Sequence, residues 1–491
     1  MSDTQPWHYV LHLINVLLLL MLTSCALFPE ADERAEMMTL PELDKTLTPA
    51  RQNLPGNDQW PAKDWWTVFA MPKLSDLIET AVSDSPQLKE VASRLQQSQS
   101  LVDAQAAEQY PTVRANVSFR FQRFSANGVQ AKLAGDDFRQ LLINPLVLRY
   151  HLDLWGKDKA ALQAAIGRSM AAAMEQVDAR LLLSAAVAQA YFDLAITSET
   201  LKFEEQILVC HQRLLRLNQV LFASGLIAND PLLSAEVELH NVQQQVSALQ
   251  TQIALQQNIL AALAGKGPDW GRDIVASPTI LPEKLPLPSD LPLHLLAHRP
   301  DLQAARLYVE AAAQEIKVAE TEFYPDVNLV SFVGLHSVSM TDILLEGSSL
   351  AYAVGPSVTF PIFEGGRLRA NLDYQEAAYD EATYKYNSQL LHAVKDVADT
   401  LARWQDIDVR LTEQQQTLAA MLKKLQIAEV KVKQGLTDQN ELLQMQVADY
   451  QQRLFLSALQ GEYLKAAVQV IRALGGGFNN NEKVCDKPCK N

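Results

Sequence analysis

Two long stretches of the chain carry the spacing and composition of uninterrupted α-helices. The first runs from Gly156 to Gly225 and, after Gly167, contains neither glycine nor proline until its end. The second runs from Gly366 to Gly435 and has no internal glycine or proline. About seventy helical residues reach roughly 100 Å, which is more than an ordinary globular domain requires. The pattern predicts a coiled-coil assembly that spans a distance.

The two halves of the chain are similar to each other. The glycines that end the two long stretches are 210 positions apart, and Gly265 and Gly475 have the same separation. Pro86 matches Pro300 at an offset of 214, and the segment SPQLKEVASRL aligns with RPDLQAARLYV. The chain is therefore predicted to be a tandem repeat of about 210 residues.

A period of two replaces the helical period just before each long stretch. Apolar and polar residues alternate over 113–122 and 146–154, and again over 326–333 (weakly) and 352–363. Runs of about ten residues with one apolar and one polar face suit tilted strands with lipid outside and water inside. A half-buried hairpin of a soluble protein has the same pattern. The candidates for the water-facing lumen of a barrel are Arg114, Arg120, Arg149 and His151.

Four strands in one chain are too few for a closed transmembrane barrel, which needs at least about eight. Open sheet edges are not tolerated in lipid, because their backbone groups would lack hydrogen-bond partners. If the strands cross a membrane, several copies of the chain must therefore pool their strands. This prediction of an oligomer is geometric.

Shorter helices are expected beside the long ones. One follows Pro86, a second follows Pro300, and return helices are expected at 231–263 and 438–473. The return helices are about half as long as their partners. We expect each long helix to pair with two shorter helices placed end to end.

Tight turns are predicted at the ends of the long helices. Gly225 suits the left-handed conformation after a helix, Asp230 suits a cap, and Pro231 suits the first helical residue. In the second repeat, Asp438 and Glu441 have the spacing of a capping box.

The N-terminus has the features of an export signal. Residues 10–22 form an apolar segment that is short for a membrane span and typical of a signal peptide. The sequence Leu22-Thr23-Ser24-Cys25 follows directly and resembles the lipobox of bacterial lipoproteins, in which the cysteine is diacylated. The alternative is an ordinary secretory signal with an incidental cysteine. Residues 29–62 are rich in proline and charge and are predicted to form an extended linker.

The composition excludes several classes of function. The 491 residues are 48% hydrophobic and 20% charged, with a net charge of −15, which argues against a nucleic-acid partner. The four cysteines do not form a disulfide framework. Cys485 and Cys489 form a small disulfide or remain free thiols, and Cys210 is expected to pack on the first long helix. No apolar run after residue 22 is expected to reach the length of a transmembrane helix.

Signatures of catalysis are absent from the sequence. It contains no HExxH, GxSxG or phosphate-binding loop motif, so we expect no catalytic residues, no metal and no cofactor. The predicted organisation is a signal peptide at 1–24, a lipid-anchored linker at 25–70, a first repeat at 71–265, a proline-rich linker at 266–299, a second repeat at 300–477 and a flexible tail at 478–491.

Several motifs occur in an order that resembles a known family. YHLDLWGK, AQAYFDL, HRPDLQAA, FYPDVNL and PIFEGGRLRANL resemble the outer-membrane efflux protein family, and more narrowly its NodT-type lipoproteins, which are relatives of TolC. The resemblance implies a mainly α fold with a transmembrane β part. In that fold, a trimer forms a 12-stranded barrel that a long α-helical barrel continues across the periplasm.

The resemblance also implies a function and its partners. The trimer would be the outer-membrane exit duct of a tripartite efflux pump in a Gram-negative bacterium. It would passively conduct small molecules such as drugs from a periplasmic adaptor and an inner-membrane RND-type pump. Cys25 would carry the diacylglyceryl and palmitoyl anchor in the outer-membrane lipid.

Two groups of site residues follow from the resemblance. The turns that dock the adaptor in the family correspond to Gly225, Leu226, Gly435 and Leu436. The family often places an aspartate nine residues after the second turn glycine as a periplasmic gate, with an apolar residue four positions before it. Gln444 and Asn440 stand at these positions, so an acidic ring is not expected here.

Two further functions are compatible with parts of the sequence. One is an outer-membrane duct for type I protein secretion, and the lipobox and the NodT-like motifs favour small molecules over it. The other is a lipid-tethered periplasmic coiled-coil protein with a structural role. Such a protein has no need of amphipathic hairpins, so the alternating runs speak against it.

Overall fold

The computed structural model describes residues 33–41, 59–123, 125, 127, 137–276, 281–282, 298–337 and 347–478. The predicted signal peptide, the lipidation site Cys25 and the tail cysteines Cys485 and Cys489 lie outside the described residues.

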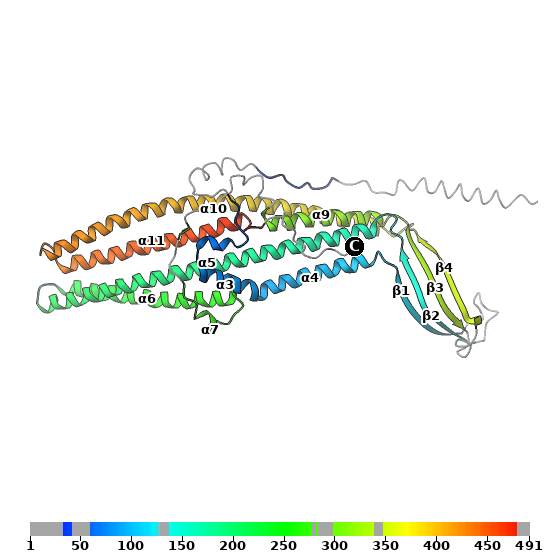
Figure 1. Cartoon of the computed structure of the whole chain (residues 1–491), viewed down its shortest axis with the longest axis horizontal. Helices are drawn as coiled ribbons and strands as arrows, with labels where there is room; N and C mark the ends of the chain where they lie inside the picture. Colours follow the sequence, from blue (N-terminus) through cyan, green and yellow to red (C-terminus); the bar gives the residue numbers. More distant parts are fainter. Residues whose placement is uncertain are drawn as a thin grey trace, which may run out of the picture. The chain divides into compact units, whose positions relative to one another are not determined.

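The described residues form long helices and one four-stranded sheet (Figure 1). In chain order the elements are η2 (Trp65–Phe69), α3 (Pro72–Asp84), α4 (Pro86–Ala107), β1 (Thr112–Arg123), β2 (Asp137–His151), α5 (Lys157–Ala223), α6 (Asn229–Leu263), α7 (Pro268–Gly271), α9 (Pro300–Thr321), β3 (Asp326–Ser337), η4 (Gly347–Ser349), β4 (Leu350–Thr359), α10 (Arg367–Lys433) and α11 (Gln439–Ala473).

The predicted repeat is confirmed by matching helix lengths. The helices α5 and α10 both have 67 residues, α6 and α11 both have 35, and α4 and α9 both have 22. Four glycines at repeat-related positions adopt positive φ angles of +68°, +69°, +69° and +89°, and they are Gly225, Gly265, Gly435 and Gly475. Each glycine follows a helix, where an L-residue with a side chain would be strained.

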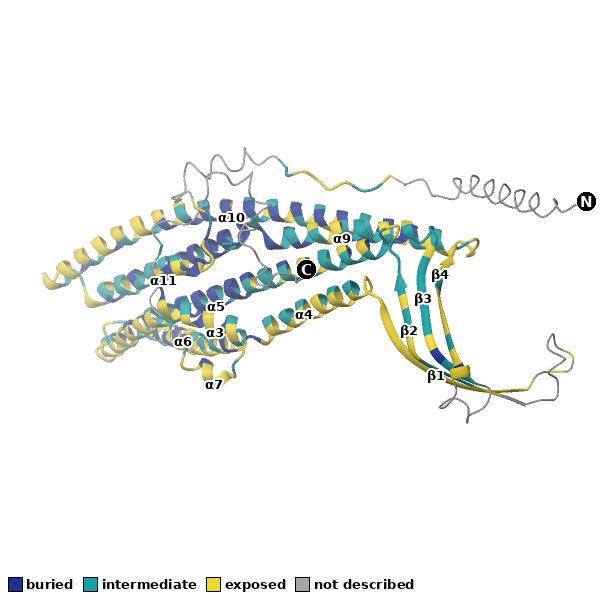
Figure 2. Ribbon diagram, turned by 45° about the vertical axis from the view of Figure 1, so that its right-hand side comes forward, coloured by how far each residue is buried: buried dark blue, intermediate teal, exposed yellow. Residues whose placement is uncertain are grey.

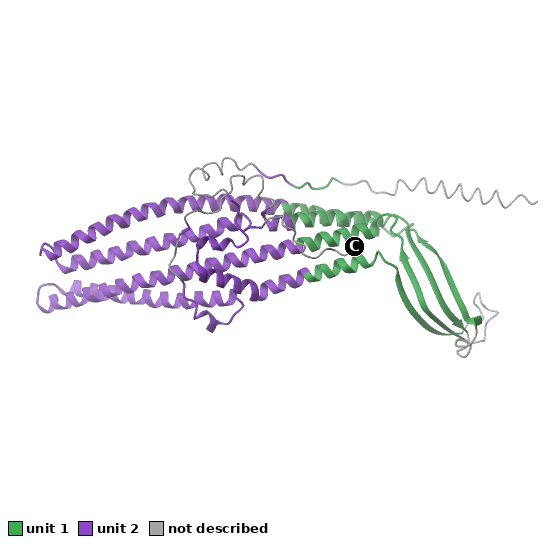
Figure 3. Ribbon diagram, in the orientation of Figure 1, with its two compact units in different colours: residues 1–37, 96–171, 305–386 green, residues 38–95, 172–304, 387–491 purple. Residues whose placement is uncertain are grey.

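The chain divides into two compact units, which Figure 3 distinguishes by colour. The first unit comprises 1–37, 96–171 and 305–386, and it contains the whole sheet together with parts of four helices. The second unit comprises 38–95, 172–304 and 387–491.

Small residues allow the helices of the first unit to approach closely. A Cβ added at Gly167 of α5 would lie 3.1 Å from the Cβ of Ala311 on α9. Beside this contact, Arg168 forms an ion pair with Glu315 at 2.9 Å. The single glycine that interrupts the first long stretch therefore marks a helix crossing rather than a break.

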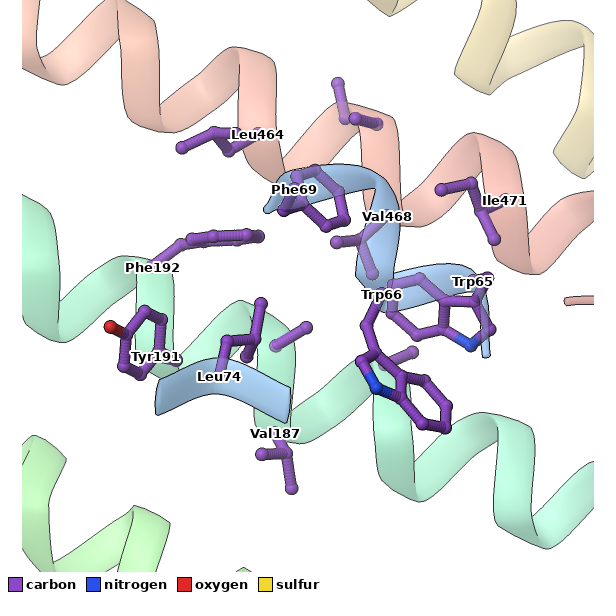
Figure 4. Close-up of a cluster of buried hydrophobic side chains, with 14 of the residues drawn as sticks. Trp65, Trp66, Phe69, Leu74, Val187, Tyr191, Phe192, Leu464, Val468 and Ile471 are labelled. Carbon is purple, nitrogen blue, oxygen red and sulfur yellow. The ribbon is translucent and has the colours of Figure 1, made fainter. Parts of the chain in front are cut away.

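The core of the second unit is an aromatic wedge between α5 and α11 (Figure 4). Trp65, Trp66 and Phe69 of η2 are each at most 3% exposed, and the ring of Phe69 lies 5.1 Å from that of Phe192 on α5. In α11, Gly461 leaves room for Ile196, because a Cβ there would come within 1.9 Å of the isoleucine side chain. The WWTVF segment thus fills the space between two helices instead of belonging to the N-terminal linker.

One composition-based expectation is wrong. Among the described residues, α5 is a helix long and apolar enough to cross a membrane, although 67% of its apolar stretch is buried inside the protein. The expectation that no apolar run after residue 22 reaches this length therefore fails for α5. A buried core helix meets the same criterion, since it too is apolar on most of its faces.

The capping predictions differ in outcome between the repeats. The N-cap of α6 is Ala228, without a side-chain hydrogen bond, so Asp230 lies in the first turn and is not the cap. In α11, Asp438 is the N-cap and its carboxylate accepts the backbone N–H of Glu441 at 3.0 Å. The Glu441 carboxylate contacts the hydroxyl of Thr437, so the box is not reciprocal.

Candidate functional site

The four strands form an antiparallel meander in the order β1-β2-β3-β4. Among the described residues, β1 pairs only with β2 and β4 only with β3, so each of these outer strands leaves one edge without a ladder. All twelve residues of β1 are exposed, as Figure 2 shows by colour. An isolated sheet with two open edges is a template for pairing with another chain.

The four lumen candidates share one face of this sheet. In the ladder, Arg114 pairs with Val147 and Arg120 with Gln140, on the face that Arg149 and His151 also occupy. Since side chains alternate along a strand, the opposite face carries the exposed large apolar residues of the strands. These are Val113, Val117, Phe119, Phe121, Leu146, Leu148, Val333, Tyr352, Val354 and Val358, many of them more than half exposed.

A bulge in β2 keeps this division of faces. The register of β2 shifts by one residue between Asn144 and Val147 against β1, and between Ile143 and Leu146 against β3. Proline fits a bulge because it cannot donate to the ladder. Opposite the bulge, Gly334 leaves room for Asn144, whose side-chain oxygen lies 2.8 Å from Nε2 of His336. Consequently Leu141 and Ile143 lie on the same face as Leu146, whereas uninterrupted alternation would place them on the opposite face.

The polar face continues to the junction with the helices. His151, the last residue of β2, has Nδ1 2.5 Å from a carboxylate oxygen of Asp158 on α5 and Nε2 3.0 Å from Asp326 on β3. Trp155 stacks on Tyr324 and donates its indole N–H to the carbonyl of Pro325 at 2.8 Å. These contacts fix the angle at which one hairpin passes into α5.

The two turns of the second unit have the same hydrogen bonds. The N–H of Gly225 donates to Phe222 O at 2.9 Å, and that of Leu226 donates to Leu221 O at 2.9 Å. The corresponding distances at Gly435 and Leu436 are 3.0 Å and 2.9 Å. This pair of bonds is the Schellman motif, which closes a helix with a glycine in the left-handed region.

Both turns present an apolar side chain outward. Leu226 and Leu436 are each 70% exposed, and no atom lies within 4 Å of a Cβ added at either turn glycine. The two candidate gate residues lie one helical turn apart on α11. The amide of Gln444 donates to the side-chain oxygen of Asn440 at 3.3 Å, and Gln444 is exposed.

A buried charged cluster in the second unit was not predicted from the sequence. Arg299, which is 9% exposed, donates to Asp301 at the start of α9 and to the carbonyl of Ala473. Gln389 of α10 donates to the same carboxylate at 3.2 Å. Burial opposes ionisation of Asp301, but the hydrogen bonds and charge of Arg299 hold its pKa below the ordinary value.

Asp178 on α5 interacts electrostatically with this cluster. Burial, the charge of Asp301 and, to a lesser extent, that of Glu175 raise the pKa of Asp178 to about 6, against the opposing effects of Arg299 and Arg472. The HRPDL motif, visible in the sequence, contains the arginine and the aspartate two positions apart. Only the fold brings Asp178 to them.

Comparison with known proteins decides the family. The model of the family described as "Outer membrane efflux protein" matches residues 77–266 and 291–476. The chain belongs to the outer membrane efflux protein family.

Members of this family that are similar to the chain support the assignment over most of its length. The multidrug resistance outer membrane protein MdtP of Escherichia coli O6:H1 is 31% identical over 428 residues, which cover 85% of the chain and 87% of MdtP. The multidrug resistance outer membrane protein MdtQ of Escherichia coli O157:H7 is 28% identical over 471 residues, which cover 94% of the chain and 97% of MdtQ. The crystal structure of the outer membrane protein VceC from Vibrio cholerae superimposes with a TM-score of 0.78 and 30% identity, covering 86% of the chain and all of VceC.

These findings confirm the fold class, the location and the general function predicted from the sequence. The outer-membrane efflux protein described here has a TolC-like fold, with long helices and a β part. It resides in the outer membrane and is an exit duct of an efflux system. Within the described residues, no group of three or more His, Cys, Asp or Glu side chains is arranged to hold a metal ion.

Proposed function

We propose that three copies of the chain form one duct for small molecules such as drugs, closed in the membrane as a 12-stranded barrel. The open edges of β1 and β4 support this proposal most directly. With four strands per chain, β1 and β4 run antiparallel, so β4 of one copy can pair with β1 of the next without breaking the antiparallel order. Two copies would give eight strands and three would give twelve; the resemblance to TolC relatives favours three.

The division of faces supports the orientation of the barrel. The apolar face would contact lipid, whereas Arg114, Arg120, Arg149 and His151 would face the water-filled lumen. An Arg on the lipid face near the bilayer midplane costs about 2–4 kcal/mol, so the opposite orientation is strongly disfavoured.

The partners in this proposal are a periplasmic adaptor and an inner-membrane RND-type pump. The exposed Leu226 and Leu436 would dock the adaptor, because each is held outward by a turn of the same geometry. The pump supplies the energy, so the duct itself catalyses no reaction. Asn440 and Gln444 would lie at the constriction of the closed state.

The proposed cargo follows from the relatives. MdtP and MdtQ are named for multidrug resistance, which favours drugs and other small molecules over proteins. A duct for type I protein secretion is the second candidate, because it would share the same fold. Loss of drug resistance on deletion, without loss of any secreted protein, would separate the two.

Cys25 is proposed as the lipid attachment site. Mass spectrometry of the mature N-terminus would show a diacylated and palmitoylated cysteine. An unmodified N-terminus at another residue contradicts this part of the proposal and leaves the barrel untouched.

Native mass spectrometry of the detergent-purified protein tests the assembly. We expect a single species of three chains. A dimer would contradict the 12-stranded barrel, and a monodisperse monomer with strand content would contradict the whole duct.

A further inference from the structure

The ring of His151 lies between two carboxylates that come from different elements. Nδ1 is 2.5 Å from Oδ2 of Asp158, the second residue of α5, and Nε2 is 3.0 Å from Oδ1 of Asp326, the first residue of β3. His151 itself is the last residue of β2. One side chain therefore connects the end of the first hairpin, the beginning of the second and the start of a long helix.

This geometry requires the charged form of the ring. A neutral imidazole carries hydrogen on one nitrogen and a lone pair on the other. In the neutral form, one of the two carboxylates would therefore face a lone pair, which is repulsive. Only the imidazolium offers a hydrogen to both carboxylates, and its positive charge strengthens both contacts.

The carboxylates around the ring are placed to stay ionised. Asp158 lies in the first turn of α5, where the positive end of the helix dipole stabilises a negative charge. Asp153, which also interacts electrostatically with the ring, accepts the backbone N–H of Lys159 at 3.0 Å. Aspartates ordinarily titrate near pH 4, so the histidine is the group of this cluster that changes charge between about pH 5 and 8.

The other charged groups nearby already have partners. Two cations line the same cavity of about 800 Å³ as His151. Lys157 lies 3.4 Å from Glu322, and Arg367 pairs with Glu322 at 3.8 Å and with Glu364. These cations therefore do not replace the positive charge of His151 when its ring loses a proton. The cavity also leaves room for the ring to turn and for water to reach it.

The two contacts of the ring differ in exposure. The side chain of Asp158 is 13% exposed, whereas that of Asp326 is 55% exposed. The pair with Asp158 is therefore less screened by water and salt and contributes more. Loss of the charge on His151 would leave the Asp158 carboxylate without this cation in a poorly solvated position, which is unfavourable.

The arrangement occurs once in the tandem repeat. The residues at the positions related by the repeat to His151, Asp158 and Asp326 are Pro361, Leu368 and Thr112. None of these three side chains can form an ion pair. The contact is thus specific to the junction of β2, β3 and α5 and is not a general requirement of the repeated unit.

We propose that His151 is a pH-sensitive pin between the sheet and α5. In its charged form the ring holds Asp158 and Asp326 together. In its neutral form it releases one of them, so the angle between the hairpin and the helix is less firmly fixed. The pin therefore tightens in acid and loosens as the pH rises. It depends only on contacts within one chain and does not rest on the proposed duct.

Hydrogen–deuterium exchange on the full-length protein tests the pin. The N–H of Leu152 donates to the carbonyl of Val327 at 2.9 Å, one residue beyond His151, and so reports on this junction. We expect the protection factor of this amide, corrected for intrinsic exchange, to fall at least about fivefold between about pH 5 and pH 8. In His151→Gln, whose side chain is neutral throughout, the protection should be the same at both pH values. His392→Gln replaces an exposed histidine on α10 and should keep the pH dependence of the unmodified protein.

A second variant makes the test independent of replacing the histidine. Asp326→Asn removes one carboxylate, and the neutral ring can then donate to Asp158 while it accepts from the amide. The protection of Leu152 should therefore change less than about twofold over the same range. Unchanged protection in the unmodified protein, or the full fall in either variant, overturns the pin. A trimer without this pH dependence contradicts the pin alone, whereas a monomer that retains it contradicts the duct alone.

Discussion

Arg299 donates to both carboxylate oxygens of Asp301, from Nε to Oδ1 at 3.0 Å and from Nη2 to Oδ2 at 2.7 Å. Their side chains are 11% and 14% exposed, so the pair is shielded from water. Two parallel hydrogen bonds fix both the orientation of the two side chains and the distance between them. The ion pair therefore stabilises the start of α9 against the end of α11, whose Ala473 carbonyl also accepts from Arg299.

Replacing one partner of this pair should destabilise the fold. Asp301→Asn leaves the Arg299 charge buried without its carboxylate, so we expect a loss of roughly 3 kcal/mol. The apparent unfolding midpoint in detergent measures it. Asp399→Asn breaks a pair with Lys395 in which both side chains are exposed and should leave the midpoint unchanged. Equal midpoints for the two variants would contradict a structural role for the buried pair.

Asp178 should make the stability of the protein fall as pH rises. Its pKa is about 6 in the folded chain and near 3.8 when exposed, so the folded state binds more protons between these values. The contribution of this group is therefore complete below about pH 4 and is lost as pH rises towards 6. Asp178→Asn should be more stable than the unmodified protein by roughly 1–3 kcal/mol above pH 6. Unfolding midpoints of both proteins from pH 4 to 8 should show the gap closing in acid; a pH-independent gap would contradict this assignment.

The two faces of β1 should respond differently to a charge. Phe119→Lys places an ammonium on the apolar face, where lipid contact costs about 2–4 kcal/mol near the midplane. Ser118→Lys adds the same charge on the polar face. We expect Phe119→Lys to reduce the amount of assembled protein in the outer membrane and Ser118→Lys to leave it unchanged. The reverse result would mean that the sheet faces are assigned the wrong way round.

The turn at Gly435 should tolerate Asn but not Val. With φ at +69° and no atom within 4 Å of an added Cβ, the cost of substitution comes from the backbone alone. A β-branched residue there costs roughly 1–2 kcal/mol or more, whereas Asn adopts this conformation more readily. Gly435→Val should displace Leu436 and reduce drug resistance in cells, with the oligomer intact on a native gel. Full resistance in Gly435→Val would argue against docking at this turn.

Gln444 tests the position of the gate. Gln444→Ala removes its hydrogen bond to Asn440 and shortens a side chain that would narrow the closed pore. We expect higher basal conductance in planar bilayers, and no change for Gln415→Ala, which truncates an exposed glutamine on α10. If Gln444→Ala conducts like the unmodified protein, Gln444 is not part of the constriction.

The strands show where sequence reasoning loses accuracy. Alternation predicts a strand from Leu146, but β2 begins at Asp137, because the bulge at Asn144 and Pro145 reverses the phase of the pattern. Alternation also persists to Phe363, whereas β4 ends at Thr359. Thr359 pairs with Asp326 of β3. The residue before Asp326 is Pro325, which has no N–H with which to extend the ladder. A period of two shows which residues alternate between the two faces of a strand. It does not show where the hydrogen bonds to the neighbouring strand end.

The sequence by itself determined the repeat, the two long helices, the glycine turns and the presence of two hairpins. These features depend on local propensity and on spacing along one segment, so they can be recognised without a partner. Only the tertiary structure decided the pairing register of β2 across its bulge, the approach of Asp178 to Arg299 and the contact of Arg34 with Glu376. Each of these joins residues far apart in the chain, and burial and charge at such contacts are set by packing rather than by sequence neighbours.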